Sequence, residues 1–160
     1  MIFVCVGTKR FQFNRLLKEI DKLITEDIIQ DEVFAQIGAS TYIPKNYSYK
    51  KYLSGEEFRF FQEKADIIIT HGGTGSIVGA LKLQKQVIAV PRLTKYGEHA
   101  DDHQLEIVDL FYKKGYIEKV EEISELGNAI NKLTKNPITK RFYGEGRIIN
   151  IIEEFINKSI

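Results

Sequence analysis

A short apolar run that leads through a glycine-rich turn into a helical segment constrains the fold of this chain most strongly. The pattern predicts a strand at residues 66–70, a turn at residues 71–76 and a helix at residues 77–83. Glycines let the backbone approach a ligand closely, and a helix N-terminus presents free N–H groups and a positive dipole end. With hydroxyl donors from Thr74 and Ser76, this order is typical of an α/β protein that binds a phosphate group, most simply a nucleotide diphosphate.

The rest of the chain alternates short apolar runs with amphipathic segments, a pattern that favours a parallel sheet with helices on both faces. Besides residues 66–70, the predicted strands are residues 2–6, 33–37 and 87–90, with a short or edge strand in residues 47–52. The other predicted helices are residues 16–24, 54–64, 122–133 and 146–157, together with a helix that begins at residue 101 or 102 and ends at residue 114. Ser54 and Glu57 form a capping box at the start of the helix at residues 54–64. The apolar stripe of residues 146–157 is wide enough to pack on the sheet, on a partner, or on both.

Composition limits the class of protein. A length of 160 residues suits one domain, and we expect residues 1–160 to form it. The chain has 23 Lys and Arg against 22 Asp and Glu, so its net charge favours neither nucleic acid nor an anionic membrane. Cys5 is the only cysteine and lies in an apolar run, which excludes an internal disulfide and a multi-cysteine metal site. With no apolar stretch of about 20 residues and no basic-flanked leader, we expect a cytoplasmic protein.

The glycine-rich and polar segments converge at one edge of the predicted sheet. In open α/β sheets, ligands bind beyond the carboxyl ends of the strands. Residues 7–8, Gly38, residues 71–76 and residues 92–104 all follow predicted strands. The sequence therefore predicts a ligand site at this edge.

Other interpretations fit less well. A P-loop needs Gly-Lys-Ser/Thr at the end of the turn, and no lysine follows until Lys82. A dinucleotide fold has its glycine fingerprint after the first strand, where this chain has only residues 7–8. A basic and aromatic stretch at residues 47–52 could contact nucleic acid, but no stronger basic patch supports it. The glycine-rich turn could also serve tight packing alone.

Three spaced motifs carry a family resemblance: Gly-Gly-Thr-Gly-Ser at residues 72–76, Val-Ile-Ala-Val-Pro-Arg at residues 87–92 and Asp-Asp-His-Gln at residues 101–104. In this order they resemble the donor-binding half of family-28 glycosyltransferases. The chain is most similar to the small subunit of two-component UDP-sugar transferases of bacterial exopolysaccharide synthesis and of asparagine-linked glycan precursor synthesis. The resemblance implies a Rossmann-like domain equivalent to the donor-binding half of a GT-B glycosyltransferase.

The resemblance also implies an activity. Such a subunit transfers a hexose or N-acetylhexosamine from UDP to a polyprenyl-diphosphate-linked sugar, with no metal or further cofactor. A membrane-anchored partner binds the acceptor, completes the active site and recruits the subunit to the cytoplasmic face of the membrane.

Matched to the family, several residues fall in the UDP-sugar site. The implied diphosphate contacts are Gly73, Thr74, Gly75 and Ser76. The implied uracil and sugar contacts are Leu53 and Ser54, and His103 and Gln104, respectively. Gly79 stands where relatives often carry a glutamate that binds the ribose, so the ribose contact is unassigned.

The catalytic candidates are His71, at the end of its strand, and His99, in a loop that could close over the donor. His71 could touch phosphate or sugar, or only hydrogen-bond nearby backbone. Arg92 could add positive charge near the diphosphate or form a surface ion pair. His99 and His103 have zinc-ligand spacing, but no third ligand is evident. The general base could belong to the partner.

Two other functions stay open. A non-catalytic module that binds nucleotide or stabilises a partner is favoured by Gly79. An NAD(P)-dependent oxidoreductase is disfavoured by the position of the glycine turn.

Overall fold

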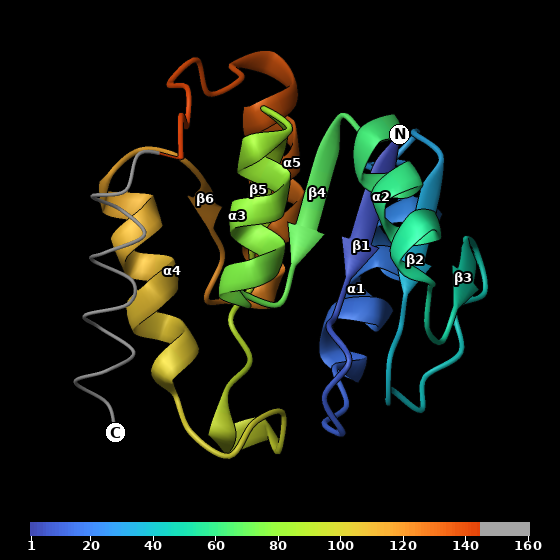
Figure 1. The fold of residues 1–160 in the computed structure, drawn as a ribbon. Coiled ribbons are helices and arrows are strands. Elements are labelled where there is room, and N and C mark those ends of the chain that lie inside the picture. The colour runs from blue at the N-terminus through green and yellow to red at the C-terminus, as the bar shows by residue number, and fades with distance from the viewer. Residues whose placement is uncertain (145–160) are drawn as a thin grey trace.

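The computed structural model describes residues 1–144, except for the side chain of His103. It contains a sheet with helices on both faces, as predicted (Figure 1). The strands are β1 (Ile2–Cys5), β2 (Val33–Gln36), β3 (Ser48–Lys50), β4 (Ile67–Thr70), β5 (Gln86–Ala89) and β6 (Glu118–Lys119). The helices are α1 (Asn14–Thr25), α2 (Gly55–Lys64), α3 (Thr74–Lys82), α4 (His103–Lys113) and α5 (Leu126–Lys135), with 3-10 helices η1 (Thr94–Tyr96) and η2 (Ile123–Glu125). The helix predicted at residues 146–157 lies outside the described residues.

The order of the strands places a ligand site. The order is β3-β2-β1-β4-β5-β6, and every pairing is parallel. From β1 the chain builds outwards through β2 and β3, and then returns to add β4 on the other side of β1. In parallel sheets the loops beyond such a reversal diverge and leave a crevice. The crevice expected here lies at the carboxyl ends of β1 and β4.

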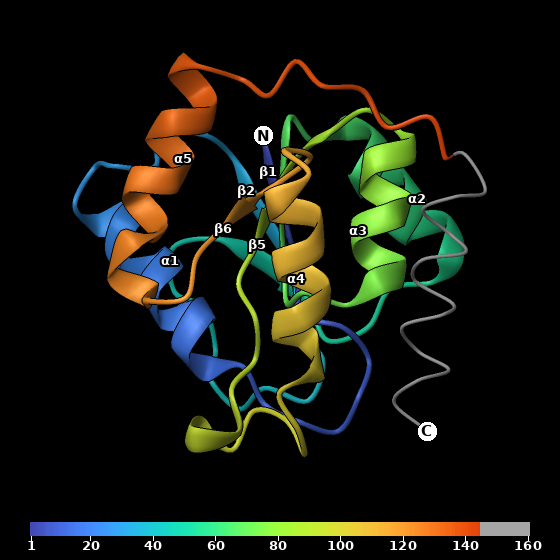
Figure 2. The same ribbon diagram turned by 90° about the vertical axis from the view of Figure 1, so that its left-hand side faces the viewer.

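Both faces of the sheet are covered, which explains why the central strands are apolar throughout. Figure 2 shows α1 and α5 on one face and α2, α3 and α4 on the other. Ile2 and Val4 of β1 join the core on the side of α1 and α5. Phe3 and Cys5 point to the opposite core, where aromatic side chains from α2 and α4 gather.

The helices follow from their sequence patterns. In α1, the buried apolar residues recur at helical spacing: Leu16, Leu17, Ile20 and Leu23. The capping box of α2 is formed as predicted, with Ser54 as the N-cap and Glu57 as its reciprocal partner. Among the described helices, none has both the length and the apolar character needed to cross a bilayer.

Some element boundaries differ from the predicted ones. The first turn of α3 uses the glycine-rich segment itself, so the helix begins at Thr74 instead of residue 77. The predicted helix at residues 122–133 is η2 followed by α5. The two-residue strand β6 was not predicted because Glu118 and Lys119 have no apolar signal. These residues pair through their backbone with β5.

Candidate functional site

A cavity of about 930 Å³ opens at the carboxyl ends of β1 and β4. It is lined by the loop after β1, the segment that leads into α2, the turn from β4 to α3 and the start of α4. The predicted site residues that line it are Leu53, Ser54, His71, Gly73, Thr74, Gly75, Ser76, His99 and Gln104. Residues far apart in the sequence therefore meet where the order of the strands places a crevice.

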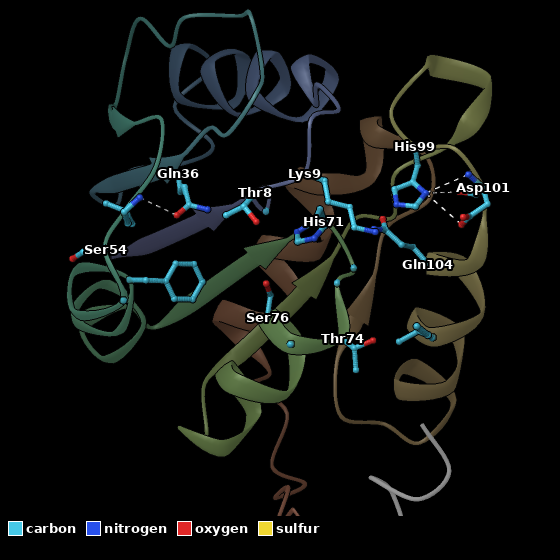
Figure 3. A pocket seen from close by; sticks show the side chains of 18 residues that line it. Thr8, Lys9, Gln36, Ser54, His71, Thr74, Ser76, His99, Asp101 and Gln104 are labelled. Carbon is cyan, nitrogen blue, oxygen red and sulfur yellow. Dashed lines mark hydrogen bonds and ion pairs between the residues drawn. The ribbon is translucent and has the colours of Figure 1, made fainter. Parts of the chain in front are cut away.

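The lining residues fall into three groups along the cavity. Figure 3 shows Gln36 and Ser54 at one end, and His99, Asp101 and Gln104 at the other. His71 and the first turn of α3 lie between these groups. The cavity thus has two polar ends joined by the N-terminus of a helix.

The first turn of α3 presents backbone donors to the cavity. Gly73 is the N-cap and supplies no side-chain hydrogen bond. The first intrahelical bond is from Ile77 N–H to the Gly73 carbonyl, so the N–H groups of residues 74–76 have no partner within the helix. Free N–H groups together with the positive end of the helix dipole are suited to binding an anion.

Two glycines hold the His71 ring between them. A Cβ atom on Gly7 would lie 2.8 Å from Nε2 of the ring, and one on Gly73 would lie 2.5 Å from the same atom. Gly7 also has a φ of +79°, which side chains rarely adopt, whereas Gly73 has an ordinary φ of −66°. Gly73 is therefore required for close approach to the imidazole and not for its backbone conformation.

The protonation of His71 follows from its surroundings. Its Nδ1 atom lies 3.2 Å from the Cys5 carbonyl oxygen. Because a carbonyl oxygen only accepts hydrogen bonds, Nδ1 carries the proton and Nε2 has the free lone pair. Burial and, to a smaller extent, the positive charge of Arg92 lower the pKa of His71 to about 4. At neutral pH the ring is uncharged, so Nε2 can accept a hydrogen bond but cannot offer a positive charge to an anion.

At the Ser54 end, two polar side chains already have partners. The Ser54 hydroxyl accepts from the Glu57 N–H at 3.2 Å and so holds the start of α2. Oε1 of Gln36 accepts from the Leu53 N–H at 3.2 Å. The side-chain amide of Gln36 is thereby left to donate to a ligand in the cavity.

Thr8 lines the cavity and belongs to a segment predicted to lie at the ligand edge, whereas Lys9 and Gln36 line the cavity without having been predicted. Each lies at or just beyond the carboxyl end of a predicted strand. That position was the signal that could have identified them.

Arg92 does not line the cavity, which contradicts the predicted ligand contact. Its side chain is fully buried, and its guanidinium donates to the carbonyls of Val6 and Phe11. The guanidinium also lies over the ring of Phe13, 5.6 Å from the centroid. The predicted surface ion pair is equally wrong, because burial encloses the group and lowers its pKa to about 10. Arg92 ties the loop after β5 to the loop after β1.

The loop expected to close over the site is fixed in place. Glu98 is fully buried, and its carboxylate accepts from Arg15 Nε and Nη2, each at 2.9 Å. The same carboxylate accepts from the Leu93 N–H at 3.1 Å. A buried bidentate pair holds the segment against α1, so the structure does not support a free lid at residues 96–98.

The far end of the cavity carries His99 and Gln104. The His99 side chain is 7% exposed, and its Nε2 has no hydrogen-bond partner among the described residues. Oε1 of Gln104 accepts from the Arg92 N–H at 3.3 Å, which leaves its amide nitrogen as the group available to a ligand. His103 is the first residue of α4, and its side chain lies outside the described part of the structure.

Residues 1–143 match the family described as Glycosyltransferase family 28 C-terminal domain. The chain belongs to this family. The predicted resemblance is thereby confirmed.

Within the family 28 C-terminal domains, this chain is similar to proteins named "UDP-N-acetylglucosamine transferase subunit ALG13". It is 34% identical to the Candida albicans protein over 88 residues, which are 55% of this chain and 28% of that protein. It is 27% identical to the human protein over 123 residues, which are 72% of this chain and 10% of that protein. The chain therefore aligns with less than a third of either relative.

Solved structures confirm the predicted Rossmann-like, GT-B type of fold. An NMR solution structure of ALG13 matches with a TM-score of 0.55 at 18% identity, over 86% of each chain. CalG4, the calicheamicin glycosyltransferase, matches with a TM-score of 0.64 at 14% identity, over 98% of this chain and 42% of CalG4. The second match shows that this family 28 domain corresponds to less than half of a longer glycosyltransferase chain.

Gly79, the position matched to a ribose-binding glutamate, faces away from the cavity lining. A Cβ atom there would lie 3.4 Å from Nε2 of Gln62 on α2, and Gly79 does not line the cavity. The structure thus supplies no ribose contact from this position.

The described residues contain no group of three or more His, Cys, Asp or Glu side chains that could hold a metal ion. The predicted pairing of His99 with His103 involves a side chain that lies outside the described part of the structure. A reaction without metal stays a prediction.

Proposed function

We propose that this chain is the donor-binding, catalytic subunit of a UDP-sugar-dependent glycosyltransferase. It would transfer a hexose or N-acetylhexosamine to a lipid-linked sugar held by a separate, membrane-anchored partner. The observation that carries the proposal is the uncapped N-terminus of α3, whose residues Thr74, Gly75 and Ser76 line the cavity where β1 and β4 end. Membership of family 28 makes a UDP-sugar the natural occupant.

The three groups of lining residues fit the three parts of such a donor. Leu53, Ser54 and the Gln36 amide would contact the uracil base. The N–H groups at the start of α3 would bind the diphosphate, and Gln104 and His99 would contact sugar hydroxyls. The ribose would lie between the base and the diphosphate, with its contact still unassigned.

The reaction requires an acceptor hydroxyl to attack the anomeric carbon as the bond from that carbon to the diphosphate oxygen breaks. The electron pair leaves with UDP, and the hydroxyl proton passes to a base. Donors aimed at the leaving oxygens stabilise the charge that develops. A pKa of about 4 makes His71 a weak base at neutral pH, so we place it as a hydrogen-bond acceptor that orients a hydroxyl. We assign the general base to the partner.

A second subunit is part of the proposal because the ALG13 relatives are named as subunits of a transferase. The described fold matches 42% of CalG4, a longer glycosyltransferase chain. We infer that the partner supplies the acceptor half and holds this chain at the cytoplasmic face of the membrane.

The activity can be tested by reconstitution. Membranes of the source organism depleted of this chain would receive the purified protein and a radiolabelled UDP-sugar. We expect label to enter the lipid fraction with the wild-type chain and not with Gly75→Ala, whose methyl group would intrude on the diphosphate. If neither UDP-hexoses nor UDP-N-acetylhexosamines label the lipids, the transferase proposal is wrong.

A non-catalytic nucleotide-binding module is the second candidate. It is favoured by Gly79, which leaves the ribose without the side chain that relatives use. Binding of UDP in calorimetry without any lipid labelling would support this function over transfer.

A further inference from the structure

Lys9 brings an unpaired positive charge to the cavity. It follows β1 in the loop that begins with Gly7, and its side chain lines the cavity. Figure 3 shows it extending towards His99 and Gln104. Within residues 1–144, no carboxylate pairs with its ammonium group. An exposed lysine without a partner is free to bind an anionic ligand.

Two other residues of the described part that could carry positive charge near the cavity, Arg92 and His71, are unavailable. Arg92 is enclosed beneath the loop and donates to backbone carbonyls. His71 is uncharged at neutral pH. Lys9 is the single lysine or arginine among the described residues that line the cavity. Apart from the helix dipole, Lys9 is therefore the lysine or arginine within residues 1–144 that can neutralise a diphosphate bound in the cavity.

Electrostatic coupling supports this placement. The pKa of His71 is lowered first by burial, then by Arg92, with smaller effects from His99 and Lys9. The ammonium group of Lys9 is thus close enough to act on the ring that lies beside the start of α3.

We propose that Lys9 binds the diphosphate of the nucleotide sugar and stabilises the UDP that leaves. This inference rests on the proposed function and adds a residue to it. When the bond to the sugar breaks, the diphosphate gains negative charge, so its attraction to a lysine strengthens as the reaction proceeds. A lysine also suits a diphosphate whose charge moves, because its ammonium group is a flexible point charge.

Arg10 offers a matched control. It is the next residue along the chain and carries the same charge, but it does not line the cavity. Its guanidinium lies over the Phe11 ring, 5.7 Å from the centroid. Removing the charge of Arg10 therefore tests how much the overall positive charge of this loop contributes to binding, while the proposed contact of Lys9 with the diphosphate is kept.

The test measures the binding of UDP by calorimetry and of uridine by NMR titration, which detects weak complexes. For Lys9→Gln we expect UDP affinity to fall about tenfold or more, as for loss of a charge-assisted contact, with uridine affinity unchanged. Lys9→Arg should retain most of the affinity, and Arg10→Gln should change it by less than about threefold. If the contact is electrostatic, the loss of UDP affinity caused by Lys9→Gln should be smaller at high salt than at low salt.

The outcomes separate the two proposals. If the wild-type chain binds UDP and Lys9→Gln binds it equally well, the role of Lys9 is refuted and the donor site stands. If Lys9→Gln weakens the binding of UDP and of uridine equally, a diphosphate contact by Lys9 is also refuted. The same holds if Lys9→Gln and Arg10→Gln weaken UDP binding equally. If the wild-type chain does not bind UDP, both proposals fall. Unfolding midpoints of the variants should match the wild type, because both side chains are exposed.

Discussion

Gly73 and Gly75 lie in the same turn but are glycines for different reasons. A methyl group on Gly73 would lie 2.5 Å from Nε2 of His71, whereas one on Gly75 would meet no protein atom within 4 Å. We expect Gly73→Ala to lower the free energy of unfolding by about 1–3 kcal/mol, as overpacking does, and to weaken UDP binding. Gly75→Ala should weaken UDP binding while stability is kept or raised by about 0.5–1 kcal/mol, because alanine favours the helix.

Urea unfolding and calorimetry of the two variants would check this contrast. Equal losses of stability in both variants would show that the His71 ring does not depend on Gly73. Unchanged UDP binding by Gly75→Ala would argue against a diphosphate at the start of α3.

His71 predicts a dependence of stability on pH. Its pKa is about 4 in the folded protein against 6.5 when unperturbed, so the unfolded chain binds more protons between these values. Neutral His71 therefore contributes up to about 3 kcal/mol to the free energy of unfolding. This contribution is fully present above about pH 7 and is lost as the pH falls towards 4. His71→Asn does not titrate, so its free energy of unfolding should fall less over this range. If the free energy of unfolding depends on pH in the same way for the wild type and for His71→Asn, the lowered pKa of His71 is contradicted.

The sequence indicated most of the predicted residues that line the cavity, some because they follow strands and others through the family resemblance, and it failed where burial decides. Arg92 lies in the loop after a strand and so was expected either to reach the ligand or to form a surface ion pair. The structure turns its side chain into the protein, towards the Val6 carbonyl. The direction of a long side chain depends on the space between two loops, which no local pattern encodes.

At the scale of elements, the segment from Pro91 to Asp102 is held by charges. The carboxylate of Asp102 accepts from the Thr94 N–H at 3.0 Å, and buried Glu98 pairs with Arg15. We expect Glu98→Gln to lower the free energy of unfolding by about 3 kcal/mol, because Arg15 would be left largely buried without its partner.

A surface pair provides the control for Glu98→Gln. Glu63 and Arg59 lie 2.8 Å apart on α2, with both side chains at least half exposed. Glu63→Gln should therefore change stability by less than about 1 kcal/mol. Similar small effects of both substitutions in urea unfolding would show that Glu98 does not anchor the segment.

Elements with a strong apolar signal were predicted correctly, and those determined by distant partners were not. The central strands are buried on both faces, so each reads as a continuous apolar run. Residues 96–98 read as an exposed loop because the partner of Glu98, Arg15, lies 83 residues earlier. Strand β6 forms because its backbone pairs with β5. The side chains of Glu118 and Lys119 give no sequence pattern that predicts this pairing.

At the scale of the whole molecule, a ligand at the reversal of the sheet should stabilise the fold. The cavity collects loops from both halves of the sheet, so unfolding either half removes the site. UDP at about 100 times its Kd should raise the free energy of unfolding by about 2.7 kcal/mol. The free energy of unfolding of Gly75→Ala should rise less at the same concentration of UDP. Thermal unfolding with and without UDP measures this, and an unchanged Tm would contradict binding to the folded chain.

The position of β1 and β4 in the middle of the sheet also bears on how such proteins diverge. The outermost strands, β3 and β6, have three and two residues, and only β3 leads into a segment that lines the cavity, residues 53–55. The margin at β6 can therefore vary while the central pair is retained. CalG4 has the same fold at 14% identity, so this architecture tolerates replacement of most of its side chains as long as the central strands stay apolar.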